Sequence, residues 1–258
     1  MKTRILTSIL IVAVVLFPIA WGGWWLEALG VAIVLCGSYE WLHALPGWAK
    51  WGWPVWFLAV LFILAVPVVW LYFPKFIFAL LGCGLILFWA LPIFCETFEE
   101  QDSMAVITFL VIMSIAFLCM QILCFRENRY LWTLCFATYG SDTGAYFSGR
   151  FLGKHKMIER ISPKKTWEGF FGGWAVGFLL SWGLSFLYGS HLNPALNLAI
   201  CILAPAFAEL GDLCFSTFKR AFHKKDFSSV LPGHGGILDR VDSLLMNFIL
   251  FGILYSVL

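Results

Sequence analysis

The chain has 258 residues, of which 61% are hydrophobic and only 12% are charged. A soluble domain is about half apolar and about a quarter charged, so this chain, folded in water, would expose large apolar patches that soluble monomers avoid. The composition therefore excludes an ordinary soluble domain and predicts an integral membrane protein. The 26 Phe and 14 Trp are consistent with a lipid environment, because Phe is apolar and Trp favours the membrane–water interface.

Hydropathy along the chain predicts an all-α fold, a polytopic transmembrane helical bundle with about nine membrane segments. A spanning helix needs about 20 mostly apolar residues. The expected segments are 5–20, 24–42, 54–73, 76–94, 104–123, 130–147, 170–189, 195–216 and 243–258. The first lacks a small-residue cleavage site, so we expect a retained span rather than a signal peptide. Helix breakers lie between these segments or at their ends, at Pro46, Pro54, Pro74 and Pro194.

We expect one membrane domain over 1–258, with spanning helices in 1–123 and a catalytic membrane region in 124–258 that carries two basic loops. With nine crossings and the N-terminus inside, six basic residues of 148–169 and five of 217–240 lie inside, whereas Lys75, Arg126 and Arg129 lie outside. The positive-inside rule favours this orientation. Both basic loops are therefore predicted on the cytoplasmic side.

Two pairs of acids flank the second basic loop. Glu209 and Asp212 end one apolar run, and Asp239 and Asp242 begin the next. Residues three apart share a helix face, and acids at membrane depth need a partner or water. Such carboxylates suit a hard cation such as Mg²⁺. The alternative is a salt-bridged interface loop, because Lys and Arg lie among the acids.

Glycines near these acids favour a phosphate site over that alternative. The set comprises Gly211, Gly233, Gly235 and Gly236. Glycine lets the backbone approach a ligand closely, and successive N–H groups can form an anion-binding nest. His234 lies among them, which makes a role near phosphate plausible.

The other basic loop repeats the pattern of acid, glycine and base. Asp142 lies near the inner end of an apolar run, and Lys164 and Lys165 precede the next segment. They could seat an anion near a helix N-terminus. The alternative is a loop that only touches lipid head groups. Neither a Walker A motif nor a dinucleotide fingerprint is present.

Together these residues resemble the signature of the phosphatidate cytidylyltransferases, also called CDP-diacylglycerol synthases. The matching positions are Ser216, Phe218, Lys219, Arg220, Lys225, Asp226, Ser228, Leu231, Pro232, His234, Gly235, Gly236, Ile237, Asp239, Arg240, Val241 and Asp242. Residues 141–146 and 162–169 resemble the same family. The motifs cover about 100 residues, and residues 1–123 add only compatible hydropathy.

The resemblance implies a bacterial inner-membrane enzyme, often a homodimer, with its active site facing the cytoplasm. It would make CDP-diacylglycerol and pyrophosphate from CTP and phosphatidic acid, using Mg²⁺ with a monovalent cation such as K⁺ as a candidate second ion. Asp212 and Asp239 would bind metal with help from Ser216, and Lys219 and Arg220 would join the catalytic set. Substrate-binding roles fall on Asp142, Lys164, Lys165, Lys225, Asp226, His234, Gly235, Gly236, Arg240 and Asp242.

Two other functions remain open at this point. A secondary transporter could use the membrane acids as an ion relay, but it would not need two basic, glycine-rich loops. A CDP-alcohol phosphotransferase also clusters aspartates, but its D-G-x-x-A-R type motif is absent. We expect no nucleic-acid partner.

Overall fold

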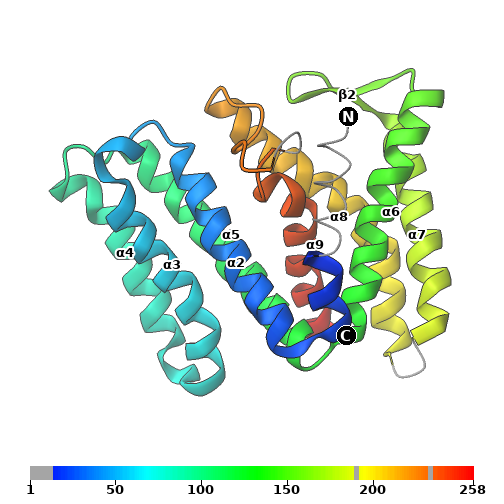
Figure 1. Cartoon of the computed structure of the whole chain (residues 1–258), viewed down its shortest axis with the longest axis horizontal. Helices are drawn as coiled ribbons and strands as arrows, with labels where there is room; N and C mark the ends of the chain where they lie inside the picture. Colours follow the sequence, from blue (N-terminus) through cyan, green and yellow to red (C-terminus); the bar gives the residue numbers. More distant parts are fainter. Residues whose placement is uncertain (1–13, 189–191, 232–234) are drawn as a thin grey trace. The chain divides into compact units, whose positions relative to one another are not determined.

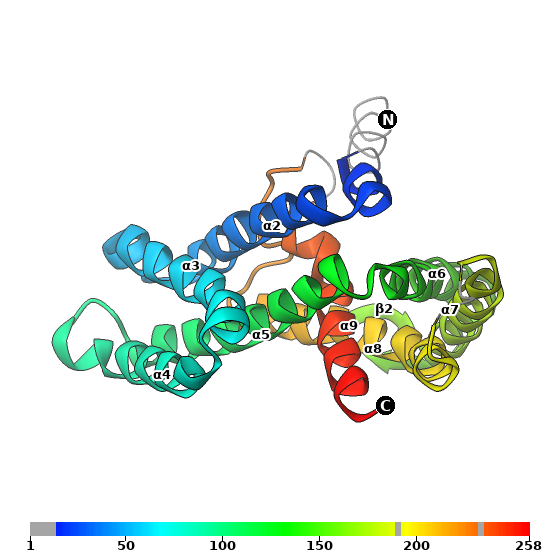
Figure 2. The same ribbon diagram turned by 90° about the horizontal axis from the view of Figure 1, so that it is seen from below.

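The computed structural model describes residues 14–188, 192–231 and 235–258, and they are mostly helical, which confirms the predicted fold class (Figures 1 and 2). The helices are α2 (Gly23–His43), α3 (Trp48–Tyr72), η1 (Pro74–Phe76), α4 (Ile77–Phe94), α5 (Glu100–Phe125), α6 (Asn128–Leu152), α7 (Trp167–Tyr188), α8 (Pro194–Ala221) and α9 (Leu238–Val257). A hairpin that was not predicted, β1 (Lys156–Ile158) with β2 (Ser162–Thr166), joins α6 to α7.

Seven segments of the described chain are long and apolar enough to span a bilayer: α2, α3, Pro74–Phe94, α5, α7, α8 and α9. The expected nine are not confirmed. Segment 5–20 lies largely outside the described residues, and 130–147 falls in α6, which carries Ser141, Asp142 and Thr143 at mid-helix. The prediction that Pro54 marks a helix end was wrong, because it lies inside α3.

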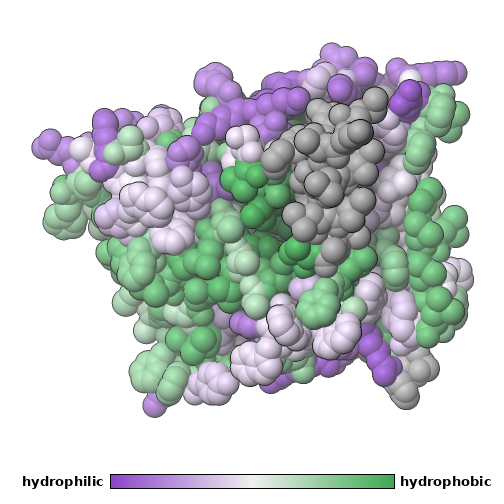
Figure 3. All heavy atoms as spheres, in the orientation of Figure 1, coloured by the Kyte–Doolittle hydropathy of each residue, from purple (hydrophilic) through white to green (hydrophobic). Residues whose placement is uncertain are grey.

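Many large apolar side chains face outward, as a lipid solvent requires. Phe78, Ile86 and Ile93 of α4 are 66–84% exposed, and Phe186 and Leu187 of α7 are 73% and 82% exposed. On the face drawn in Figure 3, apolar side chains cover the middle of the helices and polar side chains gather at helix ends. In water this surface would be an aggregation liability.

The chain divides into two compact units, which we describe separately. Unit 1 comprises the chain up to Gln121 together with Asp226–Asp239, and unit 2 comprises Ile122–Lys225 and Arg240–Leu258. The second basic loop and its acids are thus divided between the units. The expectation of one membrane domain stays a prediction.

In unit 1, α2 packs against α5 through a glycine, Gly30, and through a hydrogen bond from the Trp41 indole. Trp41 Nε1 donates to the Ala105 carbonyl over 3.1 Å. Gly30 accommodates the side chains of Phe117 and Met120, because a Cβ there would overlap both. At the helix ends, Trp51 Nε1 donates to Asp102 Oδ2 over 2.9 Å, so the buried Asp102 carboxylate is not left unpaired. These contacts fix α2 and α3 against α5.

In unit 2, α7 packs on α6 through a stripe of glycines at every fourth position: Gly169, Gly173 and Gly177. A Cβ on Gly173 would come within 2.7 Å of the Ser141 carbonyl oxygen, and one on Gly177 within 2.7 Å of that of Ala137. Small residues at this spacing let membrane helices approach closely without a hydrophobic driving force. The close approach sets the position of Asp142, which follows Ser141 on α6.

Buried polar contacts attach α8 and α9 to α6 within the same unit. Ser141 Oγ donates to the Pro205 carbonyl over 3.1 Å, and Asn247 Nδ2 donates to Thr138 Oγ1 over 2.7 Å. Pro194 opens α8, and the Asn193 side chain caps it by accepting from Ala195 N over 3.0 Å. The polar ends of α6 and α8 are thereby brought together.

We expect Gly173→Ala to destabilise the protein by about 1–3 kcal/mol, because the added methyl group overlaps backbone atoms of α6. Gly183→Ala on the same helix is the matched control, because a Cβ there meets no atom within 4 Å. Thermal unfolding in detergent measures both variants. An equal melting temperature for the two would contradict the packing described for α6 and α7.

Candidate functional site

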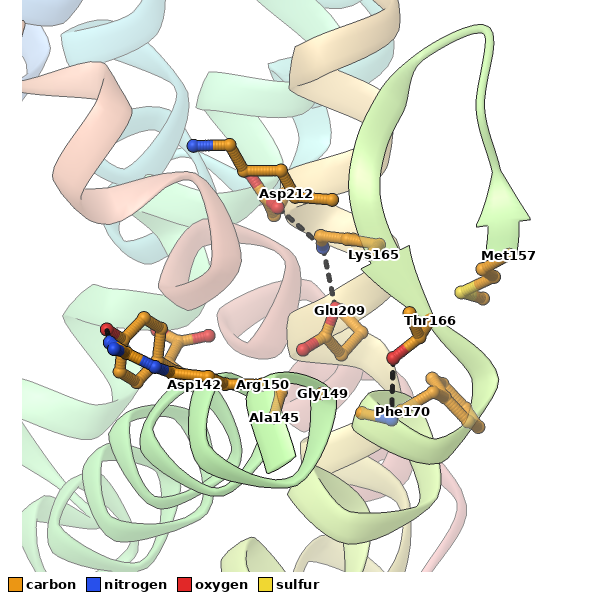
Figure 4. A pocket seen from close by; sticks show the side chains of 13 residues that line it. Asp142, Ala145, Gly149, Arg150, Met157, Lys165, Thr166, Phe170, Glu209 and Asp212 are labelled. Atoms are coloured by element: carbon orange, nitrogen blue, oxygen red, sulfur yellow. Dashed lines mark hydrogen bonds and ion pairs between the residues drawn. The ribbon is translucent and has the colours of Figure 1, made fainter. Parts of the chain in front are cut away.

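A cavity of about 480 Å³, lined by apolar and charged residues, opens between the hairpin and the ends of α6, α7 and α8 in unit 2 (Figure 4). Its lining residues are Asp142, Ala145, Tyr146, Gly149, Arg150, Met157, Lys164, Lys165, Thr166, Gly169, Phe170, Glu209 and Asp212. The volume is within the range of small-molecule sites. The lining gathers three acids and three bases, so the cavity suits a charged ligand.

Lys165 is the centre of this cavity's charge pattern. Its Nζ lies 2.6 Å from Glu209 Oε2 and 2.5 Å from Asp212 Oδ2. Dashed lines in Figure 4 mark these two ion pairs. Burial lowers the pKa of Lys165, but the negative charges of Glu209 and Asp212 and their hydrogen bonds outweigh it and hold that pKa above its ordinary value. The ammonium group is therefore charged at neutral pH, and it neutralises two carboxylates that would otherwise repel each other.

The hairpin brings Lys165 to α8 because both of its ends are fastened. Glu168 in the first turn of α7 accepts the N–H groups of Lys154 and His155 and contacts His155 Nδ1 at 2.6 Å. Thr166 Oγ1 accepts Gly169 N over 3.1 Å, which caps α7 directly after β2. Residues 162–166 thus form a strand that brings the Lys165 ammonium group to the carboxylates of α8, and an anion seat at Lys164 and Lys165 stays a prediction.

The opposite wall of the cavity comes from α6. The Asp142 carboxylate has no hydrogen bond or ion pair with other residues in the described part of the chain, so it faces the cavity without a fixed partner. One turn and two turns further along α6 lie Tyr146 and Arg150, and Arg150 Nη1 donates to Tyr146 Oη over 2.8 Å. This wall therefore offers one acid and one base to a ligand.

The predicted metal ligands on α8 lie on one helix face. Ser216 Oγ lies 3.5 Å from Asp212 Oδ1, and Ser216 is buried whereas the Asp212 side chain is 35% exposed. Among the described residues, no three His, Cys, Asp or Glu side chains form a group that could hold a metal ion.

The basic residues at the end of α8 differ in their surroundings. Arg220 Nε donates to the Ile161 carbonyl over 3.3 Å and its Nη1 donates to the Lys224 carbonyl over 2.7 Å, so it fastens α8 to the hairpin. This contact brings the hairpin of the first basic loop to residues 217–225, the part of the second basic loop that belongs to unit 2. Lys219 is buried, and Lys225 is exposed.

At the start of α9 in unit 2, Arg240 is exposed and Asp242 is buried. Asp242 Oδ1 accepts Ser243 N over 2.8 Å. The α9 backbone at Asp242 meets Gly211 of α8, because a Cβ on Gly211 would lie 3.0 Å from the Asp242 carbonyl oxygen. Asp242 and Asp212 therefore lie on helix segments that pack against each other.

The remaining predicted residues, Asp226, Gly235, Gly236 and Asp239, belong to unit 1. Asp239 Oδ2 accepts the N–H groups of Phe227 and Gly236, each over 2.9 Å. Gly235 has a φ of 82°, which favours glycine. His234 lies outside the described residues. An approach of Asp239 to Asp212 stays a prediction, because the two belong to different units.

The backbone N–H groups expected to bind an anion at residues 236–238 donate to carboxylates of the protein itself. Gly236 N donates to Asp239, whereas Ile237 N and Leu238 N donate to Glu40 Oε1 and Oε2 over 2.9 and 2.8 Å. Carboxylates of the protein itself thus accept these groups. The glycine at 236 is needed for space, because a Cβ there would lie 2.7 Å from both Glu40 oxygens.

Sequence reasoning missed four contributors. Glu209 was noted beside Asp212 but left out of the site, although the spacing of three was the signal for it. Tyr146 and Arg150 lie one and two turns beyond Asp142 on the same helix, a spacing that was readable. Glu40 gave no specific signal, because its partner Ser228 is 188 residues away.

The comparisons with known proteins agree with this picture. The sequence model of a cytidylyltransferase family matches residues 2–258. Three curated phosphatidate cytidylyltransferases, from Staphylococcus epidermidis, Staphylococcus haemolyticus and Staphylococcus aureus, are 42%, 40% and 38% identical over 148 residues. The match covers 55% of this chain and 57% of each relative, so it spans little more than half the length of these proteins.

We expect Lys165→Ala to lower the free energy of unfolding by roughly 1–3 kcal/mol, because it leaves the buried Glu209 carboxylate without its cation. Lys164→Ala, which removes the exposed neighbour, should change stability by less than about 0.5 kcal/mol. Thermal unfolding in detergent compares them.

The pH dependence follows from the raised pKa of Lys165. A raised folded-state pKa means that the ion pair's contribution to stability is complete below the unfolded value of about 10.4 and is lost as pH rises through the higher folded value. The difference in stability between wild type and Lys165→Ala should therefore stay constant from about pH 6 to 9. A difference that shrinks within this window would contradict the assignment.

Proposed function

Because the chain belongs to the cytidylyltransferase family, we propose that it transfers CMP from CTP to phosphatidic acid, giving CDP-diacylglycerol and pyrophosphate. The observation that carries the proposal is the cavity of unit 2, in which Lys164, Lys165 and Arg150 lie beside three carboxylates. The names of the staphylococcal relatives support the choice of substrates.

The reaction needs charge neutralisation more than it needs a base. A phosphate oxygen of phosphatidate attacks the α-phosphorus of CTP, an O–P bond forms, and the bond from the α-phosphorus to the bridging oxygen breaks to release pyrophosphate. The attacking oxygen is already an anion, so the barrier comes largely from repulsion between two polyanions. Fixed positive charges aimed at the phosphates lower that barrier.

Residues of unit 2 have suitable chemistry for this task. Lys164 and Lys165 come from the hairpin and Arg150 from α6, so cations reach the cavity from two sides. Arg150, whose Nη1 already donates to Tyr146, is held in place. Phosphate oxygens of CTP would compete with Glu209 and Asp212 for the Lys165 ammonium group, which lies at the centre of the cavity wall.

Mg²⁺ is proposed as the cofactor, with a monovalent cation such as K⁺ as a candidate second ion. Mg²⁺ is usually bound by one or two carboxylates plus substrate phosphates rather than by an all-protein cage. Asp212 with Ser216 offers such an incomplete oxygen set, which fits this ion. We propose Asp239 as a further carboxylate ligand of Mg²⁺. Asp242 is not proposed as a metal ligand; it lies on the part of α9 that packs against α8. The bound ion would neutralise phosphate charge.

The setting proposed for this reaction is the bacterial inner membrane, with a homodimer as the working form and the cavity facing the cytoplasm. The concentration of Lys and Arg in the two basic loops supports this orientation. CTP would then enter from the cytoplasm while phosphatidate arrives laterally from the bilayer.

The direct test incubates purified protein in detergent with labelled CTP, phosphatidic acid and Mg²⁺. We expect a lipid-soluble cytidine product and release of pyrophosphate, and we expect chelation of the metal with EDTA to abolish both. Ion-coupled uptake into vesicles without any CTP requirement would instead favour a transporter and overturn the proposal.

Asp142→Asn should lower kcat by roughly 100-fold with little change in melting temperature, because this carboxylate lines the cavity but holds no other residue of the described chain. Glu127→Gln is the matched control, since Glu127 precedes the opposite end of α6. Asp239→Asn should also abolish Mg²⁺-dependent turnover, although its amide oxygen can still accept the N–H groups of Phe227 and Gly236, which donate to a single oxygen. Wild-type activity in Asp142→Asn would count against this cavity as the site.

A further inference from the structure

Glu40 of α2 is a buried carboxylate, only 2% exposed, at the centre of the signature segment of unit 1. Its Oε1 accepts Ser228 Oγ over 2.6 Å and Ile237 N over 2.9 Å, and its Oε2 accepts Leu238 N over 2.8 Å. One side chain thus holds Ser228, near the middle of the connection from α8 to α9, together with the residues at which α9 begins.

The shape of the segment matches this carboxylate. Gly236 leaves space for both Glu40 oxygens, and Gly37, one turn before Glu40, leaves space for Leu238, because a Cβ on Gly37 would lie 2.9 Å from Leu238 Cδ2. Trp41 stacks on Phe227 with ring centroids 5.6 Å apart. Three successive contacts along α2 therefore fit the segment.

The part of α2 on which the segment packs is held against α5. Trp41, whose ring stacks on Phe227, donates its indole N–H to the Ala105 carbonyl of α5. The segment also closes on itself, since Asp239 accepts from Phe227 and Gly236, and Leu231 N donates to the Gly235 carbonyl over 3.0 Å. The position of Asp239 thus follows from the position of Ile237 and Leu238.

We propose that Glu40 is a positioning residue for the cytidylyl transfer, which holds the stretches 227–231 and 235–239 so that Asp239 is presented in one orientation. This inference rests on the proposed function and extends it to a residue outside the signature motifs. Glu40 itself touches no reacting atom. It acts through the two N–H groups and the hydroxyl group that it accepts.

A carboxylate is required because three donors converge on it. Glutamine has only one acceptor oxygen. Its NH₂ group would face the backbone N–H of Ile237 or Leu238, so that this buried donor would lose its acceptor. Aspartate keeps the charge and both oxygens on a shorter side chain, so it should restore part of the effect. Ser228→Ala removes one donor only and should be the mildest change.

The experiment combines hydrogen exchange with kinetics on the full-length protein in detergent. The variants are Glu40→Gln, Glu40→Asp and Ser228→Ala, with Glu27→Gln as the control on the same helix, about 20 Å away along its axis. We expect the amides of Ile237 and Leu238 to exchange about tenfold faster in Glu40→Gln and unchanged in Glu27→Gln.

Kinetics then separate positioning from simple loss of folded protein. In Glu40→Gln we expect kcat to fall roughly 10- to 100-fold and the Mg²⁺ concentration for half-maximal activity to rise, with Glu40→Asp intermediate. A smaller folded fraction would lower the rate without moving the Mg²⁺ requirement. Unchanged exchange would overturn the proposal, and so would faster exchange with wild-type kcat and Mg²⁺ dependence.

The proposed function has a separate readout. If the wild-type protein forms no lipid-soluble cytidine product, the cytidylyl transfer fails, whatever Glu40 does. If the product forms but Glu40→Gln and Glu27→Gln behave alike in both measurements, the positioning role fails while the function stands.

Discussion

Carboxylates in the apolar interior of this protein depend on donors brought from elsewhere in the chain. The ammonium group of Lys165 lies between Glu209 and Asp212 in unit 2, whereas hydroxyl and backbone N–H groups meet Glu40 in unit 1. A buried charge without a partner costs several kcal/mol. This constraint explains why a surface hairpin and a loop between helices have defined shapes, because each must deliver donors to an acid on a helix.

The glycine stripe of α7 has a role in the same arrangement. Because Gly173 and Gly177 let α7 lie against the α6 backbone, two walls of the cavity, α6 and α7, are helices in direct contact. Side chains on rigid elements hold their geometry better than side chains on loops. Asp142 therefore faces the cavity from a fixed position, while Lys165 arrives on the hairpin that Glu168 and Thr166 fasten.

Sequence alone predicted the helical membrane fold and brought Asp142, Lys164, Lys165 and Asp212 into one site, because hydropathy and spacing are local signals. It did not predict the hairpin, since a strand of five residues containing Ser162, Pro163 and two lysines has weak β-propensity. It could not find Glu40, because a pairing across 188 residues leaves no periodicity. The predicted number of spans is not confirmed: α6, a long helix that carries polar residues, is not among the seven candidate spans of the described chain.

The contacts of the Gly235–Leu238 segment change how phosphate recognition should be understood. A glycine-rich turn at a helix start usually suggests N–H groups that point at an anion. Here Glu40 and Asp239 already accept the N–H groups of Gly236, Ile237 and Leu238. A phosphate competing for them would have to displace a buried carboxylate, which leaves that charge unpaired. We therefore propose that the side-chain cations of the hairpin and α6 recognise the substrate phosphates, whereas Gly236 allows the close packing of the segment on Glu40 of α2.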